Sequence, residues 1–272
     1  MRGDAVAQEV MTFLLDVGNT RINWALSRCS ACSEGVPELA GVGSTVHQGV
    51  VDVEALVSAW RRFGVPRSVV GSCVASTAVR TAVESAAWRA WGIDVAWMWA
   101  RAEACGVING YPRPSSLGAD RWAALVAARA LEGERGVCIV DAGTAVTFDF
   151  LDRTGRHLGG AIFPGRRLLA QALDVGTENV TLVEDDRSGS GRLPARSTDE
   201  AVRGGIRYGA LGAVNELVAR VASERPGEHR RLLTGGDAAW LRDGLVGAWE
   251  WRPYLVLEGV AVAAAWAGGP RH

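Results

Sequence analysis

Two stretches of the chain follow one pattern: Leu14-Leu15-Asp16-Val17-Gly18-Asn19-Thr20 and Ile139-Val140-Asp141-Ala142-Gly143-Thr144-Ala145. In each, two apolar residues lead to an aspartate, a small apolar residue and a glycine, and small residues, most of them polar, follow. An apolar segment precedes each glycine turn and another comes after it, so each stretch predicts a β-hairpin. Two copies in one chain predict two similar α/β halves.

The segments around these hairpins predict alternating strands and helices. Strands are predicted at Thr12–Val17, Ile22–Leu26, Ser68–Cys73, Val95–Trp99, Val137–Val140, Ala145–Phe150, His157–Ile162 and Arg231–Leu233, and helices at Asp52–Arg62, Ser76–Trp91, Asp120–Leu131, Gly165–Leu173, Thr198–Arg220 and Leu257–Ala267. Asp52 and Ser76 are expected to cap their helices. Gly204-Gly205 predicts an interruption of the long helix, since glycine is a poor helix former.

A domain boundary is expected near the helix that connects the halves. It gives residues 11–122 as the first domain and residues 123–268 as the second. The polar stretch Thr181–Pro194 predicts a mobile loop.

The composition limits the classes of function. The chain has 272 residues, and its 29 basic and 30 acidic residues give a net charge of −1, so no basic excess indicates a nucleic-acid partner. No apolar run reaches the roughly 18 residues typical of a membrane span, and the first ten residues lack the apolar core of a signal peptide. We therefore expect a cytoplasmic protein with neither nucleic acid nor membrane as a partner.

The five cysteines argue against a disulfide framework, because their number is odd and their spacing irregular. Cys29 and Cys32 form a Cys-x-x-Cys pair, but only His47 is close in sequence and a zinc site needs four ligands. A pair of free thiols is the expectation here. Cys73 and Cys138 stand in apolar strands and are expected in the core.

The repeated hairpin carries chemistry that one copy alone would not indicate. A glycine turn can present backbone N–H groups to an anion. Asp16 and Asp141 would repel a phosphate unless a cation lies beside them, and Mg²⁺ prefers one or two carboxylates together with phosphate oxygens. The two copies favour a site for a metal–nucleotide complex over ordinary turns.

Two further motifs are ambiguous by themselves. Thr234-Gly235-Gly236 follows a strand and precedes a helical segment, where glycines can admit a nucleoside or simply form a turn. Gly118-Ala119-Asp120-Arg121 begins a helix after a proline-rich segment. There a carboxylate can accept a hydroxyl proton and an arginine can hold an anion, or Asp120 caps the helix and Arg121 is solvated.

Taken together, these motifs resemble the type III pantothenate kinases in order and spacing, from Met11 to about Ala267. Tyr111 and Thr198 fit the same pattern. The resemblance implies an α/β fold of two ribonuclease-H-like domains, as in actin and sugar kinases, with ATP and Mg²⁺ in a cleft. It implies phosphorylation of pantothenate to 4'-phosphopantothenate, the first step of coenzyme A biosynthesis, by a homodimer.

The resemblance also assigns roles to individual residues. Asp120 is the expected general base, Asp141 is expected to bind a monovalent cation (K⁺ or NH₄⁺), and Asp16 to hold Mg²⁺ through water. The expected ATP-binding residues are Asp16, Val17, Gly18, Asn19, Thr20, Arg21, Ile22, Asn23 and Thr144, and those for pantothenate are Tyr111, Gly118, Ala119, Asp120, Arg121 and Thr198.

The chain departs from the family pattern at position 23, where many relatives carry lysine and this chain has Asn23, so a positive charge is absent on the phosphate side. The first ten residues and the stretch around Cys29–Gly35 also have no counterpart in the pattern. Two other functions stay open at this point. One is a kinase with a different small hydroxyl substrate. The other is a non-catalytic nucleotide-binding regulator, because some relatives were first described as accessory factors in transcription.

Overall fold

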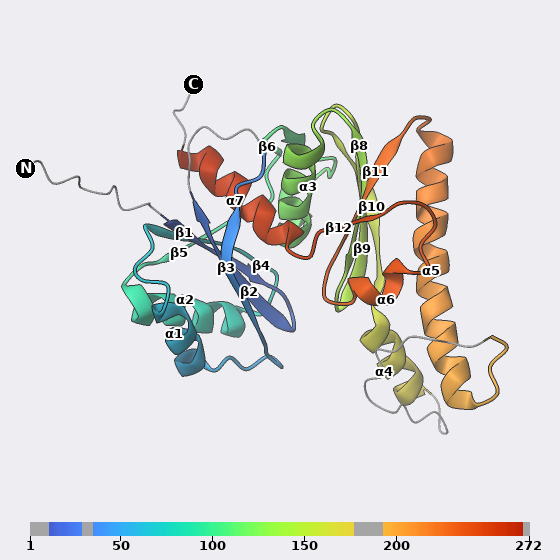
Figure 1. The fold of residues 1–272 in the computed structure, drawn as a ribbon, viewed down its shortest axis with the longest axis horizontal. Helices are drawn as coiled ribbons and strands as arrows, with labels where there is room; N and C mark the ends of the chain where they lie inside the picture. The colour runs from blue at the N-terminus through green and yellow to red at the C-terminus, as the bar shows by residue number, and fades with distance from the viewer. Residues whose placement is uncertain (1–10, 29–34, 177–192, 269–272) are drawn as a thin grey trace, which may run out of the picture. The chain divides into compact units, whose positions relative to one another are not determined.

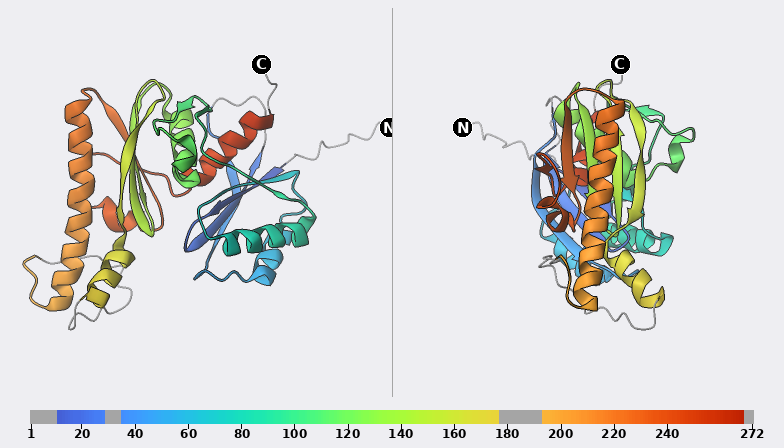
Figure 2. Two further views of the ribbon diagram at one scale, coloured as in Figure 1. Left: turned by 180° about the vertical axis from the view of Figure 1, so that it is seen from behind. Right: turned by 90° about the vertical axis from the view of Figure 1, so that its right-hand side faces the viewer.

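The computed structural model describes residues 11–28, 35–176 and 193–268 (Figures 1 and 2). Its contacts divide the chain into two compact units. The first comprises Met1–Leu131 together with Leu255–His272, and the second is Glu132–Tyr254. Each unit is built on a five-stranded sheet, as the repeated hairpin predicts.

The first unit holds the elements that surround the first hairpin. They are β1 (Met11–Val17), β2 (Arg21–Arg28), β3 (Leu39–Val46), α1 (Val53–Arg61), β4 (Ser68–Cys73), α2 (Thr77–Trp91), β5 (Val95–Trp97), β6 (Glu103–Ala104), β7 (Val107–Ile108), the 3-10 turn η1 (Pro114–Ser116), α3 (Ala119–Glu132) and α7 (Leu255–Gly268). The strand order of its main sheet is β3-β2-β1-β4-β5.

The second unit repeats this plan around the second hairpin. Its elements are β8 (Gly136–Ala142), β9 (Ala145–Leu151), β10 (His157–Pro164), α4 (Arg166–Gly176), α5 (Thr198–Glu224), β11 (His229–Thr234), α6 (Ala238–Arg242) and β12 (Glu250–Trp251). The strand order is β10-β9-β8-β11-β12. In both sheets each of the first three strands runs antiparallel to its neighbour, and the last two run parallel to the central strand. The internal repeat is therefore a repeat of topology.

Helices cover both faces of the first sheet. Figure 1 shows α1 and α2 side by side on one face, and the left view of Figure 2 shows α7 on the other. Phe13 of β1 and Trp60 of α1 pack with their ring centroids 5.3 Å apart, while Leu14, the next residue of β1, contacts the apolar side of α7. Because neighbouring residues of a buried central strand face opposite layers, both must be apolar. Asp52 and Ser76 cap α1 and α2, as predicted.

In the second unit α5 covers the sheet (Figure 1). Val214 of α5 packs against Val140, Phe148 and Phe150 of the central strands. The 27-residue helix is continuous, so the interruption predicted at Gly204-Gly205 is wrong. Helix hydrogen bonds and the buried residues that follow the pair, among them Ile206 and Ala210, offset the cost of two glycines, which is about 1 kcal/mol each.

The division of the chain differs from the expected boundary between residues 122 and 123. That point lies inside α3, within its buried run from Arg121 to Ala128. The C-terminal helix α7 belongs to the first unit, where Val256 and Val260 pack against β1 and β2. The mean hydropathy of α7 is high, and a helix of this kind is stable only when it is buried against other elements.

Several expectations fall outside the described residues: the first ten residues, the Cys29–Cys32 pair and most of the Thr181–Pro194 stretch. The strand β3, which the sequence pattern does not predict, contains Gly41 and Gly43. A side chain at Gly43 would collide with the indole of Trp24. Within the described part of the chain, no helix is both long and apolar enough to cross a membrane.

The close approach of α7 to α3 gives a stability test. A Cβ added at Gly259 would lie 1.8 Å from the carbonyl oxygen of Ala123. We expect Gly259→Ala to lower the free energy of unfolding by about 1–3 kcal/mol, as overpacking does. Gly205→Ala is the matched control, since Gly205 is exposed in α5 with no atom within 4 Å of such a Cβ. It should gain about 0.5–1 kcal/mol.

Urea unfolding of the two variants beside the parent chain measures both effects. An unchanged midpoint for Gly259→Ala would show that α7 and α3 do not pack as described.

Candidate functional site

The turn between β1 and β2 is closed by its own backbone. The Gly18 N–H donates to the carbonyl of Arg21 over 2.9 Å, which reverses the chain within four residues. Asp16 ends the strand before this turn and lies opposite Asn23 in the β1–β2 register. The Asn23 side-chain amide donates to Oδ2 of Asp16 over 2.9 Å. Asn23, the departure from the family lysine, is thus a neutral partner of this carboxylate.

The Asp16 carboxyl has an unusual environment for an aspartate. Burial raises its pKa from the ordinary 3.8 to about 7, the hydrogen bond from Asn23 lowers the pKa, and the negative charge of Asp120 raises it further. The two carboxylates that the sequence singled out in the first unit are therefore close enough to influence each other. Bringing both charges together favours a bound cation or a proton.

Asp120 stands at the start of α3, where the helix dipole favours a negative charge. Its Oδ1 accepts a hydrogen bond from the N–H of Arg121 over 2.7 Å. The same oxygen would lie 2.6 Å from a Cβ at position 118, so Gly118 leaves room for the carboxylate. The Gly-Ala-Asp-Arg motif is thereby a helix start whose carboxylate folds back over the preceding glycine.

Arg121 is buried, with 6% of its surface exposed, rather than solvated. Its Nη1 donates to the hydroxyl of Tyr111 over 2.9 Å, and its guanidinium carbon lies 5.6 Å from the centre of the Tyr111 ring. A buried guanidinium is a strong anion partner, because low dielectric strengthens its charge-assisted bonds. The structure thus brings together Tyr111 and Arg121, two of the residues predicted to bind pantothenate.

The segment before α3 is organised by Asn109, which the motifs do not single out. Its side-chain amide donates to the carbonyls of Arg101 and Pro114, and its Oδ1 accepts the N–H of Tyr111 over 2.9 Å. Asn109 is buried and these bonds use most of its capacity. The residue therefore fixes the backbone that presents Tyr111. Only its place in an otherwise irregular, glycine- and proline-rich stretch signals it in the sequence.

The second hairpin also has a turn closed by its own backbone, and this turn is one residue shorter than the first. The Gly143 N–H donates to the carbonyl of Ala145 over 3.0 Å. Gly235 lies against it: a Cβ there would be 2.4 Å from Oδ1 of Asp141 and from the Ala142 carbonyl. Thr234 is in register with Asp141. The Thr-Gly-Gly motif is thus packed directly against the second Asp-x-Gly turn.

The backbone bonds around the two turns correspond. Val74 after β4 donates its N–H to the Val17 carbonyl, and Asp237 after β11 donates to Ala142. After the outer strand, the N–H of His47 donates to the Thr20 carbonyl over 2.9 Å, and in the second unit Gly165 donates to Thr144 over 3.0 Å. Each Asp-x-Gly turn is therefore held from both sides by the segments that follow its neighbouring strands.

The remaining predicted residues vary in accessibility. Val17 and Ile22 have no exposed surface and Ala119 has 4%, so at most their backbone atoms can meet a ligand. Thr198 is exposed at the start of α5, which Ser197 caps, and it belongs to the other unit from Tyr111. Among the described residues, no three or more His, Cys, Asp or Glu side chains gather as a metal cluster.

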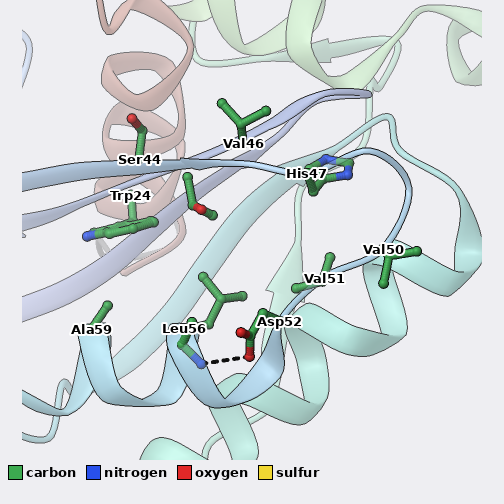
Figure 3. Close-up of a pocket in the computed structure, with 11 residues that line it drawn as sticks. Trp24, Ser44, Val46, His47, Val50, Val51, Asp52, Leu56 and Ala59 are labelled. Carbon is green, nitrogen blue, oxygen red and sulfur yellow. Dashed lines mark hydrogen bonds between the residues drawn. The ribbon is translucent and has the colours of Figure 1, made fainter.

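A pocket of about 350 Å³ lies between β3 and α1 (Figure 3) and contains none of the predicted site residues. Its lining is mixed polar and apolar, and Trp24 of β2 forms part of it. The Asp52 carboxylate accepts the Ala55 N–H as the cap of α1. His47 stands at one end of the pocket. Asp52 is therefore engaged in the helix cap.

The raised pKa of Asp16 predicts how ligand-free stability changes with pH. Because the folded state holds this proton more tightly than the unfolded state, Asp16 reduces stability as the pH rises from 3.8 toward about 7, and its effect is constant above that. We expect the melting temperature of Asp16→Asn to increase relative to the parent chain between about pH 4.5 and 7.5.

Differential scanning calorimetry at several pH values measures this difference. The exposed Asp94→Asn is the matched control for loss of one charge. A difference between Asp16→Asn and parent that stays constant with pH would contradict a raised pKa at Asp16.

Comparison with known proteins supports one family. A family model described as type III pantothenate kinase matches residues 12–220. A type III pantothenate kinase from Halorhodospira halophila is 44% identical over 255 residues, which cover 92% of this chain and 96% of that protein. The protein of the same name from Alkalilimnicola ehrlichii is 38% identical over 258 residues, which cover 94% and 98%.

The fold has solved counterparts as well. A structure described as a Baf family transcriptional activator from Campylobacter jejuni matches with a TM-score of 0.56 at 17% identity, covering 91% of this chain and 94% of that one. At this identity the match shows the fold alone. It confirms, together with the repeated sheets, the predicted α/β fold of the actin and sugar-kinase class. By its family match and its relatives, the chain belongs to the type III pantothenate kinases.

Proposed function

We propose that the protein transfers the γ-phosphoryl group of ATP to the terminal hydroxyl of pantothenate, forming 4'-phosphopantothenate in the first step of coenzyme A biosynthesis. The observation that carries the proposal is the pair Asp16 and Asp120, which stand in one unit close enough for one charge to raise the pKa of the other. In phosphoryl transfer, one carboxylate can hold the metal–nucleotide and another can orient the acceptor hydroxyl.

The Asp16 environment suits a divalent metal, which we propose to be Mg²⁺. The carboxylate is desolvated and faces the charge of Asp120. Its side-chain donor among the described residues is the neutral amide of Asn23. A nearby cation would favour its ionised form. When bound, Mg²⁺ neutralises charge on the β- and γ-phosphates. Asp16 is proposed to hold this ion through water and so to position ATP.

We assign the acceptor side to Asp120 and Arg121. The Asp120 carboxylate accepts the hydroxyl proton and orients the attacking oxygen. Arg121 is buried and bonded to Tyr111, so it offers a fixed charge for the pantothenate carboxylate. Asn109 acts through Tyr111 as a positioning residue. Gly118 and Ala119 supply the backbone that surrounds the substrate, and Thr198 is a further proposed contact.

The glycine turns are assigned to the nucleotide and its counter-ions. The segment from Asp16 to Asn23 is proposed to hold the ATP phosphates, with Gly18, Asn19 and Thr20 in the turn itself. Thr144 is proposed to contact the nucleotide, and Asp141 to hold a K⁺ or NH₄⁺ ion. We also propose a homodimer, the commonest symmetric assembly.

The activity is tested by ADP release from Mg–ATP with pantothenate and with other hydroxy acids and sugars. We expect release that depends on pantothenate and is greater in K⁺ or NH₄⁺ than in Na⁺ at equal ionic strength. Equal release without pantothenate would indicate an ATPase instead. Equal rates in the three salts would remove the cation role from Asp141.

Substitutions of the two aspartates are expected to reduce activity for different reasons. Asp120→Asn keeps nearly the same shape and should lose turnover by about 10²–10⁴-fold, the usual contribution of a general base, with Mg–ATP affinity retained. Asp16→Asn should lose turnover through weaker or misplaced Mg–ATP. Steady-state kinetics and calorimetry with a non-hydrolysable ATP analogue separate these effects.

The exposed Asp94→Asn serves again as the charge control. Near-parental turnover of Asp120→Asn would exclude it as the base. Loss of nucleotide affinity in Asp120→Asn would instead assign Asp120 to the binding of the ATP phosphates.

A further inference from the structure

His47 is a buried side chain that reaches the first glycine turn from outside the motif. It follows β3 (Figure 3), and only 4% of its surface is exposed. Its backbone N–H donates to the Thr20 carbonyl over 2.9 Å, and its Nε2 lies 3.0 Å from the carbonyl oxygen of Gly18. Backbone and side chain of one residue thus hold the two ends of the turn.

The second ring nitrogen settles which atom carries the proton. The Gly49 N–H donates to Nδ1 of His47 over 3.2 Å, so Nδ1 is an acceptor without a hydrogen. The neutral ring then has its hydrogen on Nε2, and this N–H donates to the Gly18 carbonyl. Both nitrogens are engaged, and the ring cannot rotate without losing two hydrogen bonds.

The consequence falls on the peptide bond between Gly18 and Asn19. The Gly18 N–H is already bonded to Arg21, and its carbonyl is bonded to His47. In a trans peptide the C=O and the next N–H point in opposite directions, and this peptide is trans. The Asn19 N–H therefore points away from His47. It makes no hydrogen bond within the described part of the chain, and Asn19 is exposed.

The second turn lacks this restraint, although corresponding segments donate backbone N–H groups to it. Gly165 occupies the place of His47 and makes the equivalent N–H bond, to the Thr144 carbonyl. It has no side chain, and a Cβ there would lie 2.3 Å from the Gly143 carbonyl oxygen. The imidazole is thus an addition to one of two matching turns, the one that contains Asp16.

We infer that His47 is a positioning residue for ATP: its Nε2–H fixes the Gly18 carbonyl and so aims the Asn19 N–H at a phosphate oxygen. The inference rests on the proposed function in that Gly18, Asn19 and Thr20 hold the phosphates. A donor fixed before the ligand arrives avoids the entropic cost of ordering the turn on binding. His47 touches no reacting atom and acts only through this peptide.

Three variants test the role. His47→Leu removes the donor and replaces the imidazole with an apolar side chain of moderate size. His47→Gln retains an N–H donor at about the reach of Nε2. The exposed neighbour Gln48→Leu is the matched control in the same segment. Each is measured by thermal unfolding, by calorimetry with a non-hydrolysable Mg–ATP analogue, and by KM for ATP and for pantothenate.

We expect His47→Leu to weaken analogue binding and to raise KM for ATP by about three- to tenfold, the effect of losing one neutral hydrogen bond. Its KM for pantothenate should stay within about twofold of the parent. His47→Gln should recover most of the loss, and Gln48→Leu should match the parent. Folded His47→Leu with parental analogue affinity, or with equal loss for both substrates, would overturn the inference.

The design separates this inference from the proposed function. If the parent chain binds the analogue but does not phosphorylate pantothenate, the proposed function fails and the calorimetric comparison still decides the role of His47. If the parent phosphorylates pantothenate and His47→Leu binds the analogue normally, only the inference about His47 fails. A parent chain that binds no Mg–ATP analogue contradicts both.

Discussion

The glycine turn that follows each central strand is the constraint on which both units depend. Its N–H bonds a carbonyl two or three residues ahead, so the chain reverses while the aspartate before it stays at the strand end. Two further segments then donate N–H groups to the carbonyls around the turn. Because all of these bonds are between backbone atoms, the same framework forms from different side chains. This explains why a short local pattern defines the topology of a whole unit.

The two turns nevertheless carry different side chains. Opposite Asp16 the register places Asn23, whose amide donates to the carboxylate, whereas Asp141 faces Thr147. A desolvated carboxylate with a neutral partner and a second carboxylate nearby is unfavourable in the absence of a cation. Proteins retain such arrangements at functional sites, where a ligand removes the cost. The first turn has this property.

Much of the fold follows from local sequence patterns. The features that the sequence did not predict have physical causes. The hairpins, the capped helices and the repeat depend on residues close in sequence, so the pattern predicts them. The placement of α7 depends on packing against β1 and α3, about 130 to 240 residues away in the chain, and no local signal carries it. Gly43 in β3 is explained by the Trp24 indole on the neighbouring strand, and sequence alone reads it as a strand breaker.

The candidate site divides in the same way. The motifs that contain Asp16, Asp120 and Arg121 indicate their chemistry by residue type alone. The burial of Arg121 against Tyr111 could not be predicted in this way. Asn109 acts by binding two backbone carbonyls and one backbone N–H. Its role therefore depends on the folded structure and cannot be predicted from its residue type. Polar side chains of this kind are costly to bury without full hydrogen bonding. A buried asparagine whose side-chain hydrogen bonds all go to backbone atoms therefore indicates a site with a fixed backbone conformation. A charged residue on the protein surface gives weaker evidence of such a site.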